Sequence, residues 1–226
     1  MKILFLVPKI NLDRPSGGTL HYLDLLDSMS RMNRNVDFYL VGSGKRTTKR
    51  KTKNLTIFTF PDIDTSIFRL YRDFMKARRI NSIVEDIYPD FIYYRTEPFE
   101  LFPLFMKSKK SNIIEISYNL FAKSYDVNKL VSFLWPLRNF VLNFWIKKAV
   151  NRFDAILLPS ESNKRHIEKR IKGKKMVMVR AATNPRKFRF SNPHNTKKKI
   201  VFVGNHLKYQ GAHLLIEASK ILTSQN

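Results

Sequence analysis

The 226 residues suffice for one complete α/β domain and a fragment of another, and 43% of them are hydrophobic, so the chain can bury a substantial core. The sequence lacks cysteine, which excludes disulfides, thiolate metal sites and cysteine nucleophiles. Its 42 Lys and Arg against 18 Asp and Glu give a net charge of +24, which favours anionic partners: nucleic acid, anionic lipid or phosphorylated ligands. A lysine-rich composition spread over the whole chain accounts for that excess equally well.

The N-terminal segment, Met1–Pro8, superficially resembles a secretion signal, but its apolar core is too short and no small-residue cleavage site follows it. No apolar run reaches the roughly 18 to 20 residues that span a bilayer. The sequence therefore predicts a cytoplasmic protein without a transmembrane anchor.

Apolar runs typical of strands that are buried on both faces recur along the chain. They lie at Lys2–Val7, Val36–Val41, Leu55–Phe60, Phe91–Tyr94, Asn112–Ser117, Asp154–Leu158, Met176–Val179 and Ile200–Val203. Helical spacing predicts helices at Thr19–Met32, with Leu20, Leu23, Leu26 and Met29 on one face, and at Ile67–Ile87. Ser160 is a suitable N-cap for a third helix at Glu161–Ile171. This alternation predicts an α/β fold: a Rossmann-like, mostly parallel sheet with helices on both faces.

The link Gly42–Asn54 has no apolar periodicity and is predicted to be a loop. It carries the densest basic cluster, Lys45–Lys53, with six Lys or Arg in nine residues. Because no aromatic residue interrupts the cluster, a solvated loop is favoured over a nucleic-acid site.

A polar stretch at residues 181–198, with Pro185 and Pro193, predicts a linker between domains. The first domain then covers residues 1–180. Residues 199–226 supply a strand, a loop and a helix, which is an incomplete second α/β domain. One strand and one helix cannot bury a core. Four apolar residues there are therefore expected to dock on the first domain, pair with another chain or stay exposed: Phe202, Leu214, Leu215 and Ile221.

Two glycine-containing turns each follow a predicted strand and open a helix. Gly17 and Gly18 follow the first strand, and Gly204 and Gly211 bound the loop after the last one. Glycine lets the backbone approach a ligand, and a helix N-terminus presents free N–H groups to an anion such as a diphosphate. Taken singly, each turn also fits a plain connection between a strand and a helix.

The order of these features resembles the N-terminal part of the family 4 glycosyltransferases, nucleotide-sugar enzymes of the GT-B fold. Besides the Gly-Gly turn, the matching segments are Pro89–Arg95, Asn112–Ser117, Phe153–Ser160, Met178–Phe188 and Ile200–Gly204 continuing through Gly211 to Leu214–Ala218. The resemblance covers essentially the whole chain and rests on the order and spacing of the segments.

The resemblance implies two Rossmann-like domains facing each other, with the first binding the acceptor and the second most of the sugar nucleotide. It implies transfer that retains anomeric configuration without a metal or other cofactor. The donor-side phosphate-binding residues would be Gly17, Gly18, Gly204, Asn205, Lys208, Gln210 and Gly211. Metal-free transfer needs positive groups and N–H dipoles aimed at the leaving diphosphate.

The sequence departs from the family in three places. Asn205 and Gln210 stand where the family usually has phosphate-contacting Arg and Lys, although Lys208 and His206 are close by. The turn before the linker is Ala181–Asn184 in place of the common Asn-Gly-Val-Asp. The acidic donor-sugar motif would lie beyond Asn226, so an enzyme impaired by truncation is expected.

On the acceptor side, the candidates are Arg95, Glu115 and Ser117, which lie at strand ends where α/β sheets bind ligands. A surface ion pair of Arg95 with Glu97, and a shared hydrogen bond between Glu115 and Ser117, are equally acceptable structural roles. His21 is expected to be partly buried and structural. No histidine follows Ser117 closely, as one does in some family members.

An aromatic and basic stretch, Leu130–Arg152, contains both tryptophans, Trp135 and Trp145. It fits an interfacial membrane contact, and also a helix packed against the sheet through Phe140, Phe144 and Ala149.

Three hypotheses follow: a glycosyltransferase with a nucleotide-sugar donor and a glycan or lipid-linked acceptor, a non-catalytic remnant or half of a split enzyme completed by a second chain, and a basic protein that binds the inner face of an anionic membrane. Nucleic acid is disfavoured because no nucleic-acid motif is visible.

Overall fold

The computed structural model describes residues 1–14, 16–61, 69–96, 102–105, 111–116, 140, 144, 147–179, 202 and 211–224. The chain divides into two compact units. The first consists of Met1–Phe121 and Pro136–Asn184, and the second of Ala122–Trp135 and Pro185–Asn226. The domain boundaries expected from the sequence fall at residues 181–198, outside the described residues, and stay a prediction.

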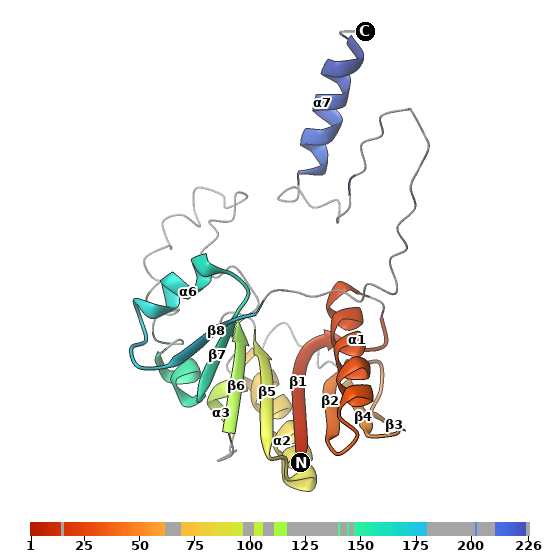
Figure 1. Ribbon diagram of the computed structural model, residues 1–226, viewed down its shortest axis with the longest axis vertical. Helices are drawn as coiled ribbons and strands as arrows, with labels where there is room; N and C mark the ends of the chain where they lie inside the picture. Colours follow the sequence, from red (N-terminus) through yellow and green to blue (C-terminus); the bar gives the residue numbers. More distant parts are fainter. Residues whose placement is uncertain are drawn as a thin grey trace. The chain divides into compact units, whose positions relative to one another are not determined.

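The first unit is built on a sheet that has eight strands in the described part of the chain, in the order β3-β4-β2-β1-β5-β6-β7-β8 (Figure 1). Their bounds are β1 (Lys2–Asn11), β2 (Asp37–Gly44), β3 (Thr48–Thr52), β4 (Leu55–Pro61), β5 (Phe91–Thr96), β6 (Ser111–Ile116), β7 (Ala155–Leu158) and β8 (Lys175–Met178). Every neighbouring pair is parallel except β3 and β4. The prediction of a mostly parallel α/β sheet is confirmed.

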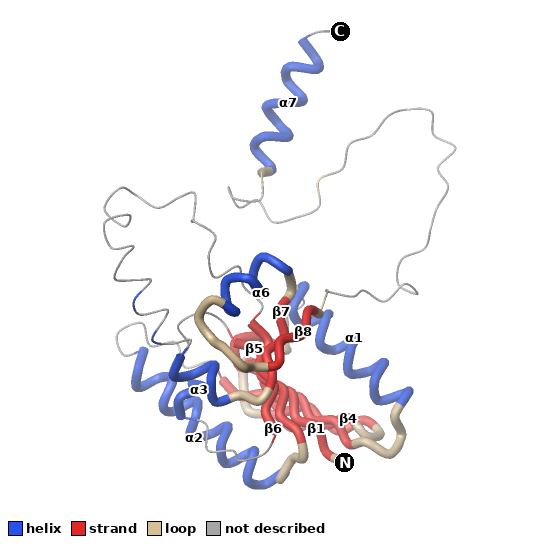
Figure 2. Tube along the Cα trace, turned by 60° about the vertical axis from the view of Figure 1, so that its left-hand side comes forward, coloured by secondary structure: helices blue, strands red, loops and turns tan. Residues whose placement is uncertain are grey.

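Helices cover both faces of the sheet, as predicted (Figure 2). They are α1 (Gly17–Met32), α2 (Arg69–Ile87), the short α3 (Phe102–Phe105) and α6 (Glu161–Glu168), with a 3-10 turn η1 at Val150–Arg152. Helix α1 packs over Phe5, Val7, Phe38 and Leu40. Helices α2 and α6 pack on the other face, over the side chains that alternate with these, such as Leu4 and Leu6. Successive strand residues point to opposite faces, so each strand contributes to both layers.

The rotation of α1 about its axis differs from the sequence expectation. Its fully buried side chains are Thr19, Tyr22 and Leu26, whereas Leu20, predicted to face the core, is 49% exposed. The Thr19 hydroxyl donates to the Asn11 carbonyl at 2.9 Å, which fixes the first turn against the end of β1. The prediction for Leu20 was wrong because a polar anchor and a large aromatic ring, rather than the leucine spacing, set the rotation.

The segment Gly42–Asn54 is a hairpin arm and not the predicted loop. Strand β2 continues to Gly44, and β3 pairs antiparallel with β4 from Thr48↔Thr59 to Thr52↔Leu55. The basic side chains of β3 are exposed, as an edge strand permits, so no apolar alternation marks it in the sequence. The Thr48 and Thr59 hydroxyls, 2.6 Å apart, share a hydrogen bond across this pair.

Further local expectations are met in part. Ser160 caps α6 by accepting from the Asn163 amide. In the stretch 130–152, Phe140 and Phe144 are exposed while Ala149 is buried, so of the residues named for the packed-helix alternative only Ala149 lies in the core. Apart from Phe140 and Phe144, the structure does not describe residues 130–146. Among the described helices, none combines the length and apolarity needed to cross a bilayer.

In the second unit, the structure describes the helix α7 (Ala212–Ser224), which follows Gly211 as predicted. Gly211 has a φ of 80°, which favours glycine at this helix start. Leu214 and Ile221 are more than half exposed, in keeping with the exposed alternative for this tail. Of the strand predicted at 200–203, only Phe202 lies among the described residues.

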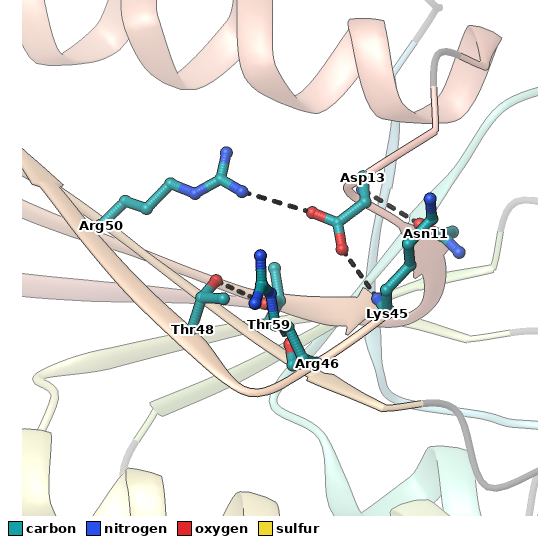
Figure 3. A network of polar contacts seen from close by, with 7 residues as sticks. All are labelled: Asn11, Asp13, Lys45, Arg46, Thr48, Arg50 and Thr59. Atoms are coloured by element: carbon teal, nitrogen blue, oxygen red, sulfur yellow. Dashed lines mark hydrogen bonds and ion pairs between the residues drawn. The ribbon is translucent and has the colours of Figure 1, made fainter.

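Two glycines let the chain cross the end of β2 after it leaves β1. The Leu12 amide donates to the Ser43 carbonyl at 2.8 Å, and Asp13 accepts from the Lys45 amide at 2.7 Å (Figure 3). A Cβ at Gly42 would lie 2.7 Å from the Leu12 side chain, and one at Gly44 would lie 2.6 Å from Asp13 Oδ2. The absence of a side chain at both positions therefore lets the segment before α1 lie directly on the end of β2.

We expect Gly44→Ala to destabilise the first unit by about 1–3 kcal/mol, because its Cβ would overlap Asp13 and also Thr59 Cβ, 2.9 Å away. Gly17→Ala is the matched control, since a Cβ there meets no atom within 4 Å. It should leave stability unchanged or raise it by up to about 1 kcal/mol, as alanine favours helix. Urea unfolding followed by circular dichroism measures both variants. Equal changes in their free energies of unfolding would contradict the close packing of Asp13 and Thr59 around Gly44.

Candidate functional site

The strand order reverses next to β1, where open α/β sheets bind their ligands. From β1 the chain passes through α1 to β2 on one side, while β5 and the strands after it extend the sheet on the other. The carboxyl ends of β1, β5 and β6 therefore meet beside the start of α1. In the described residues, the apolar cluster on the α1 face reaches as far as Tyr93 of β5, whereas on the opposite face the cluster continues to Met176 of β8. Beyond that point, Arg95 and Glu115 lie on the α1 face near the strand ends, next to the half-buried apolar residues Ile113 and Leu157.

A carboxylate and two phenols make the centre of this group. The Tyr22 hydroxyl of α1 donates to Glu115 Oε2 of β6 at 2.6 Å. It also lies 3.1 Å from the Tyr93 hydroxyl of β5. Residues of three elements are joined in this way, and the short bond to Oε2 is typical of a hydroxyl that donates to a charged carboxylate.

Two basic residues flank the carboxylate. Arg95 pairs in register with Glu115 across β5 and β6, and its guanidinium carbon lies 5.3 Å from the centre of the Tyr22 ring. A cation at that distance is attracted to the face of an aromatic ring. The His21 ring packs edge-on against Tyr22, with ring centres 5.1 Å apart, and is partly buried as expected.

The surroundings shift two acid-base equilibria. Burial raises the pKa of the Glu115 carboxyl above its usual 4.5, while the bond from Tyr22 and the nearby His21 act in the opposite direction. Burial also raises the pKa of Tyr22, and the Glu115 charge adds to that rise, so Tyr22 stays a hydroxyl donor. Glu115 therefore releases its proton at a higher pH than a free carboxyl does, and once ionised it accepts hydrogen bonds.

The start of α1 adds backbone donors at the same edge of the sheet. The Ser16 hydroxyl accepts from the Thr19 amide at 3.1 Å, and the Leu20 amide donates to the Ser16 carbonyl. The amides of Gly17 and Gly18 precede the first helical bond and have no acceptor within the helix. Since the space beside Gly17 is open, both amides suit an approaching anion.

Of the sequence-predicted residues, the structure thus pairs Arg95 with Glu115 across β5 and β6, and places Gly17 and Gly18 at the start of α1, at the same edge of the sheet. Gly211 lies in the second unit, and five others fall outside the described residues: Ser117, Gly204, Asn205, Lys208 and Gln210. The alternative partners Glu97 for Arg95 and Ser117 for Glu115 fall there too. Among described residues, no three His, Asp or Glu side chains are grouped to hold a metal ion.

Sequence reasoning missed Tyr22 and Tyr93. Alternation along β5 places Tyr93 and Arg95 on one face, which is a usable signal. No comparable signal existed for Tyr22, because its selection depends on how α1 is rotated.

No protein-family model matches the sequence, and no curated protein sequence matches it. Solved structures match in shape. Sucrose-phosphate synthase from Thermosynechococcus elongatus is similar over 83% of this chain, with a TM-score of 0.58 and 9% identity. The apo structure of OtsA and a trehalose-6-phosphate synthase structure, OtsA, give TM-scores of 0.52 and 0.50 at 8% and 9% identity, again over 83% of this chain.

The chain spans about half the length of these proteins, covering 49% to 51% of theirs. The chain therefore has a Rossmann-like α/β fold that matches GT-B glycosyltransferases, and the predicted resemblance is confirmed for the fold.

The raised pKa of Glu115 predicts a pH-dependent difference in stability between the protein and Glu115→Gln. The folded state holds this proton more tightly than the unfolded state, so the contribution of Glu115 is greatest below the unfolded value near 4.5 and is lost as pH rises through the folded value. As the pH rises from the unfolded pKa to the folded pKa, the free energy of unfolding of the wild type, relative to that of Glu115→Gln, should decrease. Urea titrations from mildly acidic to neutral pH measure it. If this difference does not change with pH, folding does not shift the pKa of Glu115.

Proposed function

We propose that this chain takes part in transferring a sugar from a nucleotide-sugar donor to a glycan or lipid-linked acceptor, and that the first unit supplies the acceptor side. The observation that carries the proposal is the grouping of Glu115, Tyr22 and Arg95 at the strand-order reversal of a sheet with a glycosyltransferase-like fold. Fold alone does not define chemistry, so the polar group supplies the functional argument.

Glu115 suits the role of acceptor for a substrate hydroxyl. Its Oε2 is engaged by Tyr22, and within the described residues no hydrogen bond to Oε1 is found. A carboxylate oxygen can accept a hydrogen bond from a glycan hydroxyl and so orient the hydroxyl oxygen toward the sugar carbon that it attacks. Arg95 beside it suits an anionic group on the same acceptor, such as the phosphate of a lipid-linked glycan.

For the donor, we assign the diphosphate to the amides of Gly17 and Gly18. In the second unit, the residues that the sequence predicts as a separate phosphate-binding loop are Gly204, Asn205, Lys208, Gln210 and Gly211. Backbone N–H groups at a helix start stabilise charge that develops on a leaving diphosphate. The chemistry assigned here needs no metal ion or other cofactor.

A second candidate is a non-catalytic protein, or one part of an enzyme completed by a second chain. It is favoured by Asn205 and Gln210, which are neutral where phosphate-binding cations are expected. We place either form in the cytoplasm, in contact with the inner face of the membrane.

The test is an assay of the purified full chain with a panel of nucleotide-sugars and with glycan or lipid-linked acceptors. Transfer or donor hydrolysis above the level of the Glu115→Gln variant supports the proposal. If neither reaction occurs but the chain still binds glycan acceptors, the second candidate holds. If the chain shows neither turnover nor acceptor binding, the acceptor-side role that we assign to the first unit is wrong.

Arg95→Gln should lower kcat/KM for an anionic acceptor by about 10- to 100-fold, because a charge-assisted hydrogen bond contributes roughly 1.5–3 kcal/mol. The effect should be much smaller for a neutral acceptor. Arg165→Gln on α6 is the matched control, since Arg165 is exposed and its ion pair with Glu161 is long, at 3.9 Å. Equal losses for anionic and neutral acceptors would exclude the assigned role of Arg95.

A further inference from the structure

The hairpin that replaces the predicted loop gathers basic side chains at one edge of the sheet. This basic hairpin, residues 45–54, comprises β3, the residues before it and the turn into β4. Its six cations are Lys45, Arg46, Lys49, Arg50, Lys51 and Lys53, all exposed. The hairpin itself contains no acidic residue.

The basic surface continues at the C-terminal end of α1, which is the end away from the candidate site. A surface cavity of about 720 Å³ is lined by Ser30, Arg31, Arg34, Lys53 and Asn54. Its three cations come from the last turn of α1, the residues after it and the hairpin turn. The cavity and the basic hairpin share Lys53 and Asn54 and so form one continuous surface.

Carbonyl groups at the end of α1 would normally weaken such a site, because a helix C-terminus carries partial negative charge. Here the Asn54 side-chain amide donates to the carbonyls of Ser30, Asn33 and Val36, at 3.3, 3.1 and 2.7 Å. Among these bonds, the one to Ser30 occupies a carbonyl of the last helical turn. Arg31, Arg34 and Lys53 contribute positive charge to the cavity lining.

Few carboxylates compensate the surface. Asp27 pairs with Arg31 at 2.7 Å, and Asp13 lies 3.5 Å from Arg50 (Figure 3). Asp37 alternates with the buried Phe38 and so belongs to the opposite face from the cavity. Arg34, Lys51 and Lys53 make no ion pair with the described residues. Gathering like charges without partners is unfavourable unless an anionic partner offsets it.

We propose that the basic hairpin and the adjoining cavity dock the protein on an anionic lipid bilayer, with the cavity receiving a lipid phosphate. Cations of β3 alternate between its two faces, with Lys49 and Lys51 on one and Arg50 on the other, so they form a rim along the sheet edge. Such a rim suits a broad plane of phosphates rather than insertion into a duplex groove. It offers no aromatic side chain within residues 45–54 on which single-stranded bases would stack.

Charged edge strands also prevent sheet-to-sheet aggregation, and this role needs separating from membrane docking. Charge reversal separates them, because glutamate protects an edge as lysine does but repels anionic lipid. The test variant is Lys49→Glu/Lys51→Glu/Lys53→Glu. The control is Lys169→Glu/Lys172→Glu/Lys175→Glu, which changes the net charge equally at exposed positions near α6 and β8.

Co-sedimentation of the full chain with phosphatidylcholine vesicles, with and without phosphatidylglycerol, gives the readout. We expect the wild type to bind only the anionic vesicles, more weakly as salt rises, and the hairpin variant to bind at least about tenfold more weakly. The control should change binding far less. Since Lys49 lies over the Phe58 ring at 5.4 Å, a Lys51→Glu/Lys53→Glu variant checks the result if the triple variant melts early.

Equal losses for the hairpin and control variants would overturn the proposal in favour of a general charge effect. Binding to pure phosphatidylcholine that the hairpin variant retains would also overturn it. A duplex DNA arm gives the third contrary outcome: hairpin-dependent binding to DNA without binding to vesicles would make nucleic acid the partner.

Discussion

A parallel sheet needs cover on both faces, and the limits of that cover shape this molecule. Within the described residues, α2 and α6 pack along most of one face, whereas the apolar cluster beneath α1 reaches only as far as Tyr93. Just beyond that limit, the strands present Arg95 and Glu115. A carboxylate in such a half-covered position must find hydrogen-bond donors from the protein, and Tyr22 of the covering helix provides one.

The position of that helix depends on the crossing of the chain over β2. Because Gly42 and Gly44 lack side chains, Leu12 and Asp13 lie directly against the end of β2. The crossing leads into the Ser16 cap and the bond from Thr19 to Asn11, which set the rotation of α1. Tyr22 then reaches Glu115. The close packing of the crossing therefore also determines where Tyr22 meets Glu115 in the candidate site.

Charge serves two separate purposes in the first unit. Beside α1, one arginine and one partly buried carboxylate meet aromatic rings, and the low solvent exposure strengthens their interactions. At the sheet edge, the cations of the basic hairpin are exposed and largely without carboxylate partners, which suits long-range attraction to an anionic surface. A transferase that acts on lipid-linked acceptors would use both: the surface to approach the bilayer and the cluster to orient the acceptor.

The sequence by itself determined the α/β alternation, the parallel sheet and the helix starts at Ser160 and after Gly211, since apolar runs and capping residues act over a few neighbours. It also pointed to Arg95 and Glu115, because strand ends in such sheets meet at one edge. It missed β3, whose exposed lysines show no apolar alternation, and it misjudged Leu20. Only the tertiary structure decided which face of α1 is buried, and with it the role of Tyr22, because that choice rests on contacts between residues as distant as Asn11, Tyr93 and Glu115.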